Sequence, residues 1–359
     1  MTKSRVLIVS HNTSLNGPAD YYCRYLVSKD FEVSRIIHPL DVYKRRDSKI
    51  IVDKRIIKKY RRKEIGLVNL IIDIFISVKY ILKISPEVIV GANNFDVLPA
   101  IIVKKIFRKK VKMIIYFASD YSEKRFNSLF LDLFYKIIEK ISLRYSDITI
   151  SNTVRAEAKR LQFNLDKAKS LVIPNSVHLE TPRFNEKNID KTLFIYIGSV
   201  TREHGLFEII SVLASTIKHL TIIGQGEDLK RITDFCEDQS VNIKVHSGKD
   251  REFVIEYLQD FAGIGLAPYN LHSKWTYYCS PLKVNEYIAC GVPVLISNVP
   301  EVAQYVKEKQ LGMTYGEGDL EHAKLSKIIE DFSTENFYLK SEKFYSEFND
   351  NNLFSKIPV

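Results

Sequence analysis

The chain has 359 residues, of which 45% are hydrophobic, and it carries a formal net charge of +10. This length suits two domains of ordinary size, and the hydrophobic fraction excludes an intrinsically disordered chain. The four cysteines show no Cys-x-x-Cys spacing, which is typical of reduced thiols in a cytosolic protein. Residues 1–10 lead directly into a predicted strand without a signal-peptide pattern, so we expect a cytoplasmic location.

The charge is distributed unevenly along the chain. Residues 1–190 hold 36 Lys and Arg against 20 Asp and Glu, whereas residues 191–359 hold 17 against 23. The first half is therefore strongly basic, which indicates an anionic partner such as a nucleic acid, an acidic membrane surface or a phosphorylated acceptor. No recognisable DNA-binding or RNA-binding motif accompanies this charge, so we do not predict a nucleic-acid partner.

Strands alternate with helices through the first half of the chain. The expected strands are short apolar runs at residues 5–10, 31–37, 87–91, 112–117 and 147–151. The expected helices lie near residues 19–29, 95–107, 127–144 and 153–162. This alternation predicts an α/β fold with a doubly wound parallel sheet.

Polar residues follow several of these strands, where parallel sheets usually bind their ligands. His11, Asn93, Asn94, Ser119 and Asp120 are expected on loops at this edge. His11 could position an acceptor hydroxyl, or it could be a hydrogen-bonded loop histidine without a catalytic role. Asp120 could accept a proton from an acceptor sugar, or it could cap a helix or fix a loop.

Residues 44–63 form a basic run with 11 Lys and Arg against two Asp. Each such cation near an anionic leaflet contributes about 1 kcal/mol, so the run predicts peripheral attachment to a membrane surface. The alternative is a solvated flexible loop. Residues 66–84 are expected to form a helix that covers the sheet. This helix should not span a bilayer, because Asp73 and Lys79 near its middle would each cost roughly 2.5–3.5 kcal/mol.

A polar segment at residues 173–190 separates the first half from a second series of strands and helices. The expected strands of this series are residues 192–198, 221–224, 242–245, 263–267 and 292–296.

Residues 277–300 contain the pattern around which the second half is organised. Ser280 is a plausible N-cap and Pro281 suits the first helical position, while Gly291 and Pro293 are typical of a helix exit. The chain therefore predicts a helix from about residue 281 to residue 290.

The start of this helix is a candidate anion site. The backbone N–H groups of Leu282 and Lys283 would be free at the helix N-terminus, next to the Lys283 cation. Glu286 lies one turn later on the same helix face. A phosphate at the N-terminus and a sugar hydroxyl near the carboxylate together describe a bound nucleoside diphosphate.

Residues 280–294, Ser-Pro-Leu-Lys-x-x-Glu-Tyr-x-Ala-x-Gly-x-Pro-Val, resemble the donor-binding segment of retaining, nucleotide-sugar-dependent glycosyltransferases. These are the glycosyl transferases of group 1, or family 4-like enzymes, which have the GT-B fold and build bacterial polysaccharides and glycolipids. The resemblance is good over about residues 192–315. One position differs, because many members carry a Glu where this chain has Tyr278.

Two further segments resemble glycine loops of this family. Gly17 falls in the first loop, which lies at the interdomain cleft in the family, although a simple turn would also explain it. Gly198 opens a loop that contacts the donor phosphates. Here Ser199 and His204 replace the basic residues of the family, and Arg202 is a possible substitute.

The remaining donor-side resemblances are weaker. Gly226 belongs to a Gly-x-Gly turn that a helix start explains equally well. Pro-Asn-Ser-Val at residues 174–177 resembles the end of the family's first domain. Trp275, Tyr277 and Tyr278 could line the sugar pocket, or they could pack on the core.

The resemblance implies two Rossmann-like domains that face a cleft. We expect an acceptor-binding domain at residues 1–175, a linker at 176–190 and a nucleotide-sugar domain at 191–335. Residues 336–359 are expected to form helices that pack back on the first domain.

The implied activity is a retaining, metal-independent hexosyl transfer from a nucleoside diphosphate sugar, without another cofactor, to a glycan or lipid-linked acceptor. The alternative is a catalytically weak partner subunit that binds a nucleotide sugar. The candidate residues fall into three groups. The catalytic candidates are His11, Asp120 and Lys283. The donor-binding candidates are Gly198, Arg202, Gly226, Tyr278, Ser280, Pro281, Leu282, Lys283 and Glu286. The acceptor-side candidates are Gly17, Asn93 and Asn94, and no residues are expected to hold a metal.

Overall fold

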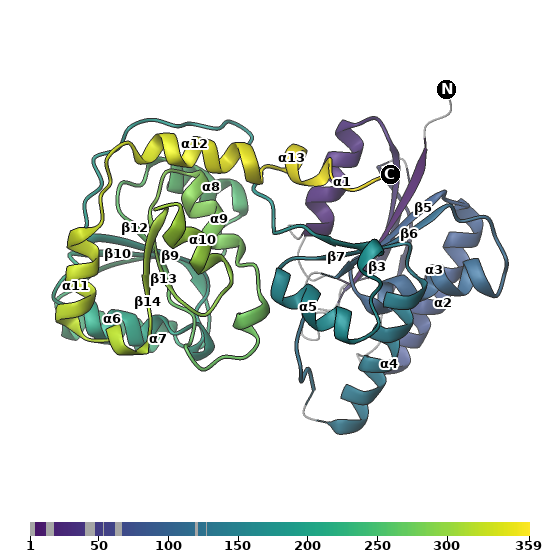
Figure 1. Ribbon diagram of the computed structural model, residues 1–359, viewed down its shortest axis with the longest axis horizontal. Coiled ribbons are helices and arrows are strands. Elements are labelled where there is room, and N and C mark those ends of the chain that lie inside the picture. Colours follow the sequence, from purple (N-terminus) through teal and green to yellow (C-terminus); the bar gives the residue numbers. More distant parts are fainter. Residues whose placement is uncertain are drawn as a thin grey trace. The chain divides into compact units, whose positions relative to one another are not determined.

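The structure is a computed structural model that describes residues 4–11, 18–39, 47–52, 54–61, 67–118, 121–126 and 128–359. The chain divides into two compact units (Figure 1). The first unit comprises Met1–Pro174 and Leu353–Val359, and the second comprises Asn175–Asn352.

The first unit is built on an eight-stranded sheet with the order β4-β3-β2-β1-β5-β6-β7-β8. Its strands are β1 (Arg5–His11), β2 (Glu32–His38), β3 (Ser48–Val52), β4 (Arg55–Tyr60), β5 (Val88–Gly91), β6 (Met113–Ala118), β7 (Ile148–Ser151) and β8 (Ser170–Val172). Its helices are α1 (Pro18–Ser28), α2 (Leu67–Ile84), α3 (Asn94–Lys105), α4 (Leu129–Tyr145) and α5 (Val154–Gln162). The strands from β2 through β1 to β8 pair in parallel, as the alternation predicts.

The described part of the basic run forms a hairpin instead of a flexible loop. β3 pairs antiparallel with β2, and β4 pairs antiparallel with β3 at the edge of the sheet. Val, Ile and Tyr favour strands, and this hairpin contains Ile50, Ile51, Val52, Ile56, Ile57 and Tyr60. Most of β4 is exposed, so its cations remain in contact with solvent.

The second unit is built on a six-stranded parallel sheet with the order β11-β10-β9-β12-β13-β14. Its strands are β9 (Leu193–Ser199), β10 (His219–Gln225), β11 (Asn242–His246), β12 (Ile264–Ala267), β13 (Val294–Ser297) and β14 (Gly312–Tyr315). Its helices are α6 (Leu206–Leu213), α7 (Leu229–Asp238), α8 (Arg251–Asp260), α9 (Leu282–Ala289), α10 (Val302–Glu308), α11 (His322–Asp331) and α12 (Phe337–Phe348).

The bounds of the two units differ from the expected domain bounds near the C-terminus. Helix α12 belongs to the second unit, where Phe344 is buried in the core and stacks on Phe348 at 4.3 Å between ring centroids. The following helix, α13 (Asp350–Phe354), leads into the residues that belong to the first unit. There Phe354 packs on Tyr22 and Phe117. Helix α12 therefore contacts α9 of the second unit, and only Leu353–Val359 belong to the first unit.

Membrane crossing is not supported by the described helices, because none of them is both long and apolar enough to span a bilayer.

Candidate donor and acceptor sites

Tyr287 of helix α9 forms a hydrogen bond with the central strand β9 of its sheet. The Tyr287 hydroxyl accepts a hydrogen bond from the backbone N–H of Ile197 at 2.9 Å, in the middle of β9. The ring lies over Gly265 of β12, where a Cβ would come within 2.7 Å of it. This close approach needs a glycine, and it fixes the position of the helix relative to the sheet.

The start of α9 differs in detail from the predicted cap. Pro281, not Ser280, is the N-cap, and it gives no side-chain hydrogen bond to the first turn. The Ser280 hydroxyl instead accepts a hydrogen bond from the backbone N–H of Asn175 at 3.2 Å. Asn285 donates to the Asn175 carbonyl at 2.6 Å. Ser280 thus ties the start of the helix to residue 175, and the N–H groups of Leu282 and Lys283 receive no cap from Pro281.

The Lys283 side chain lies beside the end of β9. Its Nζ is 4.0 Å from the centroid of the Tyr196 ring, a cation–π contact. A Cβ on Gly198 would lie 3.4 Å from this Nζ, and Gly198 has φ +113°. Gly198 therefore allows both the backbone turn and the approach of the ammonium group.

The charge of Lys283 is poorly compensated. Burial lowers the pKa of Lys283 to about 7, although Cys279 and Glu286 partly oppose this effect. A group whose charged form is disfavoured would gain from a negative ligand placed next to it. The N-terminus of α9, with its partial positive charge, favours the same kind of ligand.

Glu286 is buried and forms an ion pair with Arg251 at the start of α8. Burial raises the pKa of Glu286, while the charge and hydrogen bond of Arg251 oppose the rise. Glu286 lies one helical turn after Lys283 in α9, as the predicted helix implies. Arg251, which the sequence analysis did not single out, orients this carboxylate.

The Gly-x-Gly turn after β10 exists because two backbones come very close. A Cβ on Gly226 would lie 2.0 Å from the carbonyl oxygen of Val200, and one on Gly224 would lie 2.0 Å from that of Gly198. Gly226 therefore has a packing role at the edge of the site, where it supports the loop that follows β9.

The loop after β9 carries two of the candidate polar residues. Arg202 is largely exposed, and its Nε lies 3.8 Å from the buried Asp228. Burial and the nearby Lys283 lower the pKa of His204 to about 4, so the ring is neutral at physiological pH. His204 therefore adds hydrogen-bonding capacity here and no positive charge.

The aromatic residues before α9 have different environments. Tyr278 is buried, with its ring 5.1 Å from that of Tyr277. Tyr277 and Trp275 are 45% and 39% exposed, and Trp275 meets the His204 ring edge-on at 5.9 Å. The side chains of Tyr277 and Trp275 are thus partly exposed to solvent, whereas Tyr278 is buried.

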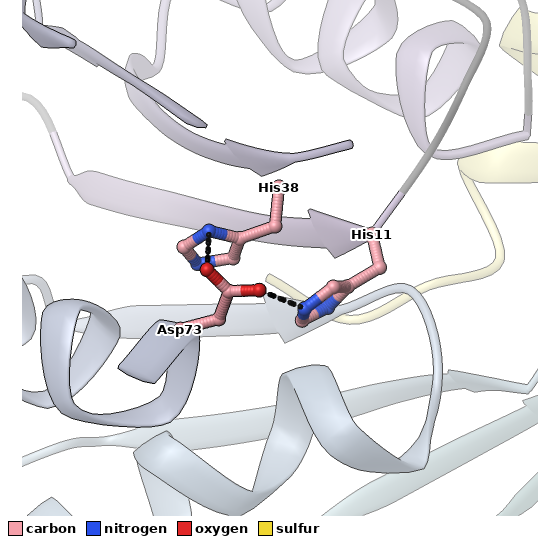
Figure 2. Close-up of side chains that lie close together, drawn as sticks. All are labelled: His11, His38 and Asp73. Carbon is pink, nitrogen blue, oxygen red and sulfur yellow. Dashed lines mark hydrogen bonds and ion pairs between the residues drawn. The ribbon is translucent and has the colours of Figure 1, made fainter. Parts of the chain in front are cut away.

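In the first unit, His11 is the last residue of β1 and lies between Asp96 and Asp73, the second of which Figure 2 shows. Its Nδ1 lies 2.5 Å from Asp96 Oδ1, and its Nε2 lies 3.2 Å from Asp73 Oδ2. Burial alone would lower the pKa of His11, but the charges and hydrogen bonds of Asp96 and Asp73 outweigh it and raise the pKa to about 9. A protonated ring with both nitrogens engaged is a poor base, so the contacts favour the structural alternative for His11.

His38 extends this network into the core. Its Nδ1 is 3.1 Å from Asp73 Oδ1 and its Nε2 is 2.9 Å from the Ser77 hydroxyl. The ligand atoms of His11, His38 and Asp73 lie within 4.8 Å of one another, a grouping of types that can hold a divalent ion. Each ring nitrogen already has a hydrogen-bond partner, however, so the network is complete without an ion.

The two asparagines predicted on the acceptor side make structural contacts at the start of α3. Asn93 is its N-cap, and its side-chain oxygen accepts from the backbone N–H groups of Phe95 and Asp96. Asn94 is fully buried, and its carbonyl oxygen accepts from Ser142 of α4. Gly17, Ser119 and Asp120 lie outside the described residues.

Some of these residues could have been found from the sequence. Asp73 is the only acid in a largely apolar helix, which is a signal for a buried partner. Arg251 follows the predicted strand at residues 242–245 by only a few residues. Its pairing with Glu286 depends on how α8 and α9 pack, and no local pattern reveals that.

Residues 179–349, which lie within the second unit, match the family model of glycosyl transferases group 1. No curated protein matches the chain significantly in sequence.

Solved structures resemble the chain over its full length. Sucrose-phosphate synthase from Thermosynechococcus elongatus has a TM-score of 0.69 at 15% identity, and the match covers 97% of this chain and 95% of that one. The lipopolysaccharide outer core galactosyltransferase WaaB has a TM-score of 0.67 at 14% identity, with 99% and 100% covered. Anabaena HepE in complex with UDP-glucose has a TM-score of 0.67 at 12% identity, with 98% and 97% covered. The chain therefore has the GT-B fold, and its second unit carries the match to group 1 glycosyltransferases.

Proposed function

We propose that this GT-B chain, with its group 1 match at residues 179–349, is a retaining glycosyltransferase that uses a nucleoside diphosphate sugar. The observation that carries the proposal is the start of α9. There a half-buried ammonium group with a lowered pKa lies beside backbone N–H groups that Pro281 leaves uncapped.

The diphosphate of the donor would occupy this corner of the second unit. Its oxygens would accept hydrogen bonds from the N–H groups of Leu282 and Lys283 and from the Lys283 ammonium group. As the sugar departs, negative charge develops on the diphosphate, and these groups would stabilise it where it forms. Lys283 is thus the residue of the second unit that we assign to catalysis.

The ribose would lie near Glu286, whose carboxylate would accept hydrogen bonds from its hydroxyls. Arg251 holds this carboxylate in place and favours its ionised form. Trp275 and Tyr277 present exposed ring faces nearby in the sequence, and such faces pack against the C–H faces of sugars.

Because Lys283 and the N-terminus of α9 would neutralise the charge of the diphosphate, we propose a reaction without a divalent metal or other cofactor. Transfer should then persist in the presence of EDTA at the rate seen with Mg²⁺. A rate that collapses with EDTA and returns with Mg²⁺ would contradict this part of the proposal.

The acceptor would be a glycan or a lipid-linked glycan in bacterial cell-surface polysaccharide synthesis. The basic first unit suits a phosphorylated or membrane-bound acceptor. Residues 44–63 would contact an anionic surface, and the exposed cations Arg55, Lys58 and Lys59 of the edge strand β4 support this role. The protein would then work in the cytoplasm, on the inner face of the membrane.

The first experiment is a thermal-shift screen of wild-type protein against a panel of nucleotide sugars, because a ligand stabilises the state it binds. The same donor should give no shift with Lys283→Met, whereas Lys230→Met, an exposed lysine on α7, should behave as wild type. An equal shift in both variants would contradict the assignment of the diphosphate to α9.

The alternative is a partner subunit that binds a nucleotide sugar and transfers nothing. Tyr278, Ser199 and the neutral His204 stand where many family members have a charged residue, which motivates it. Turnover of the donor identified in the screen, tested with candidate lipid acceptors, separates the two. Tight binding with no transfer to any acceptor would favour the partner subunit.

A further inference from the structure

Two helices of the first unit leave an apolar face uncovered. On α4, Leu129, Phe130, Leu133, Phe134 and Ile137 are all exposed, with Leu129 at 86% and Phe130 at 73%. On α2, Val68, Ile71, Ile72 and Phe75 are exposed, with Val68 at 71% and Phe75 at 69%. Their spacing of three, four or one residues places each set on one side of its helix. Single exposed apolar side chains are ordinary, but contiguous sets mark an interaction surface.

The two helices share the same charge layout. The apolar set of α2 is followed on the same side by Lys79 and Lys83, and that of α4 by Lys140 and Arg144, while Lys136 lies within the α4 set. The acids of the two helices, Asp73, Asp132 and Glu139, are buried. Among their described exposed side chains, those in the first half of each helix are therefore apolar except Lys136, and those in the second half are cationic except Tyr145.

Both apolar halves lie at the same edge of the first unit. Helices α2 and α4 flank α3 and contact it (Figure 1). Asp73 in the first half of α2 contacts His11 at the end of β1, and Asn94, just after β5, contacts the Tyr135 carbonyl of α4. This is the edge where the parallel strands end, and where α/β sheets bind their ligands.

We propose that these outward faces of α2 and α4, here called the α2/α4 face, insert into the interfacial region of an anionic lipid bilayer. Apolar side chains on the surface of a helix bind among headgroups and acyl chains, and flanking cations bind anionic lipids. This deepens the proposed function, on which it rests for the lipid-linked acceptor. It assigns insertion to this face and leaves long-range attraction to residues 44–63.

Charge complementarity selects the membrane over another copy of the chain. A second α2/α4 face would bring cations against cations, which disfavours association. An anionic leaflet supplies the opposite charge and an apolar layer together, and it matches both halves of each helix.

The test is flotation of the full chain with vesicles of phosphatidylcholine alone or mixed with phosphatidylglycerol, without nucleotide. Wild type should float with the mixed vesicles, and Phe130→Ser/Leu133→Ser should bind them at least about tenfold more weakly. The matched control is Leu339→Ser, which removes an exposed leucine from α12 of the second unit and should change nothing. Lys58→Gln/Lys59→Gln on β4 should weaken binding without abolishing insertion.

Insertion itself is measured with Phe130→Trp in a Trp275→Phe background, using lipids brominated along their acyl chains. Because the chain has a single native tryptophan, the introduced indole is then the only one, and quenching of its fluorescence on vesicle binding is expected. The proposal would be overturned if the Phe130→Ser/Leu133→Ser variant floated as well as wild type, or if no quenching were seen. It would also be overturned if wild type did not bind vesicles but self-associated, and if this variant abolished the self-association. Nucleotide thermal shifts are read separately, so failure here leaves the donor assignment standing.

Discussion

At the scale of single residues, the proposed donor site at the start of α9 is defined by charges that burial makes costly. Lys283 has a lowered pKa, and Glu286 has a raised one that Arg251 opposes. In the first unit the opposite holds, because His11 is surrounded by acids that raise its pKa. The second unit therefore holds charges that a ligand can still stabilise, whereas the charge of His11 is already satisfied.

The lowered pKa of Lys283 predicts how donor affinity depends on pH. In the free protein the ammonium form declines above a pH of about 7. A bound diphosphate favours that form, so binding takes up a proton, and affinity for the nucleoside diphosphate should fall as pH rises from 7 to 9. Titration calorimetry at several pH values measures it, with Lys283→Met as a control that should show much weaker dependence. An affinity that does not change across this range would contradict the prediction.

Arg251→Ala should remove the partner of a buried carboxylate. Breaking a buried ion pair in this way costs about 3–5 kcal/mol, which urea unfolding would measure. Without Arg251 the folded-state pKa of Glu286 should rise further, so the variant should regain stability as pH falls through that pKa. Arg251→Lys should lose less, because it keeps a cation. A small loss of stability that does not vary with pH would argue against the pair.

At the scale of elements, close backbone packing decides the shape of the proposed donor site. The ends of β9 and β10 approach so closely that Gly224 and Gly226 have no room for a side chain. Tyr287 then links α9 to β9 through the N–H of Ile197. The loop, the glycine turn and the helix N-terminus are thereby held against the same strand ends.

Gly226→Ala should therefore destabilise the second unit. The new Cβ would collide with the carbonyl oxygen of Val200, which lies in the backbone and cannot rotate away as a side chain could. Overpacking of this kind typically costs about 1–3 kcal/mol. The matched control is Gly318→Ala, where no atom lies within 4 Å of the added Cβ. Equal unfolding free energies for the two variants would show that the close approach is not maintained in solution.

At the scale of the whole molecule, charge and chemistry are divided between the two units. The basic half of the sequence forms most of the first unit, and the group 1 match lies within the second. The division fits a protein in which one unit meets an anionic acceptor surface and the other holds the donor.

Salt should separate the two contributions to vesicle binding. The Debye length falls from about 10 Å at 0.1 M salt to about 3 Å at 1 M, so attraction by exposed cations such as Lys58 and Lys59 should weaken steeply. Burial of the apolar side chains of the α2/α4 face is not screened, and a salt-resistant fraction should remain. Flotation across a salt series measures both parts. Complete release at high salt would mean that charge alone holds the protein on the vesicle.

The sequence by itself determined the alternation of strands and helices, the helix that begins near Pro281 and the position of Glu286 one helical turn after Lys283. These follow from local periodicity, turn residues and the spacing of one helical turn, which do not depend on distant parts of the chain. The tertiary structure decided the rest. In it Ser280 accepts a hydrogen bond from Asn175, Glu286 forms an ion pair with Arg251, and His11 contacts Asp73 and Asp96. Part of the basic run forms a hairpin, and the outward side of α2 remains exposed. Apart from the β3–β4 pairing, these features depend on residues far apart in sequence that only packing brings together.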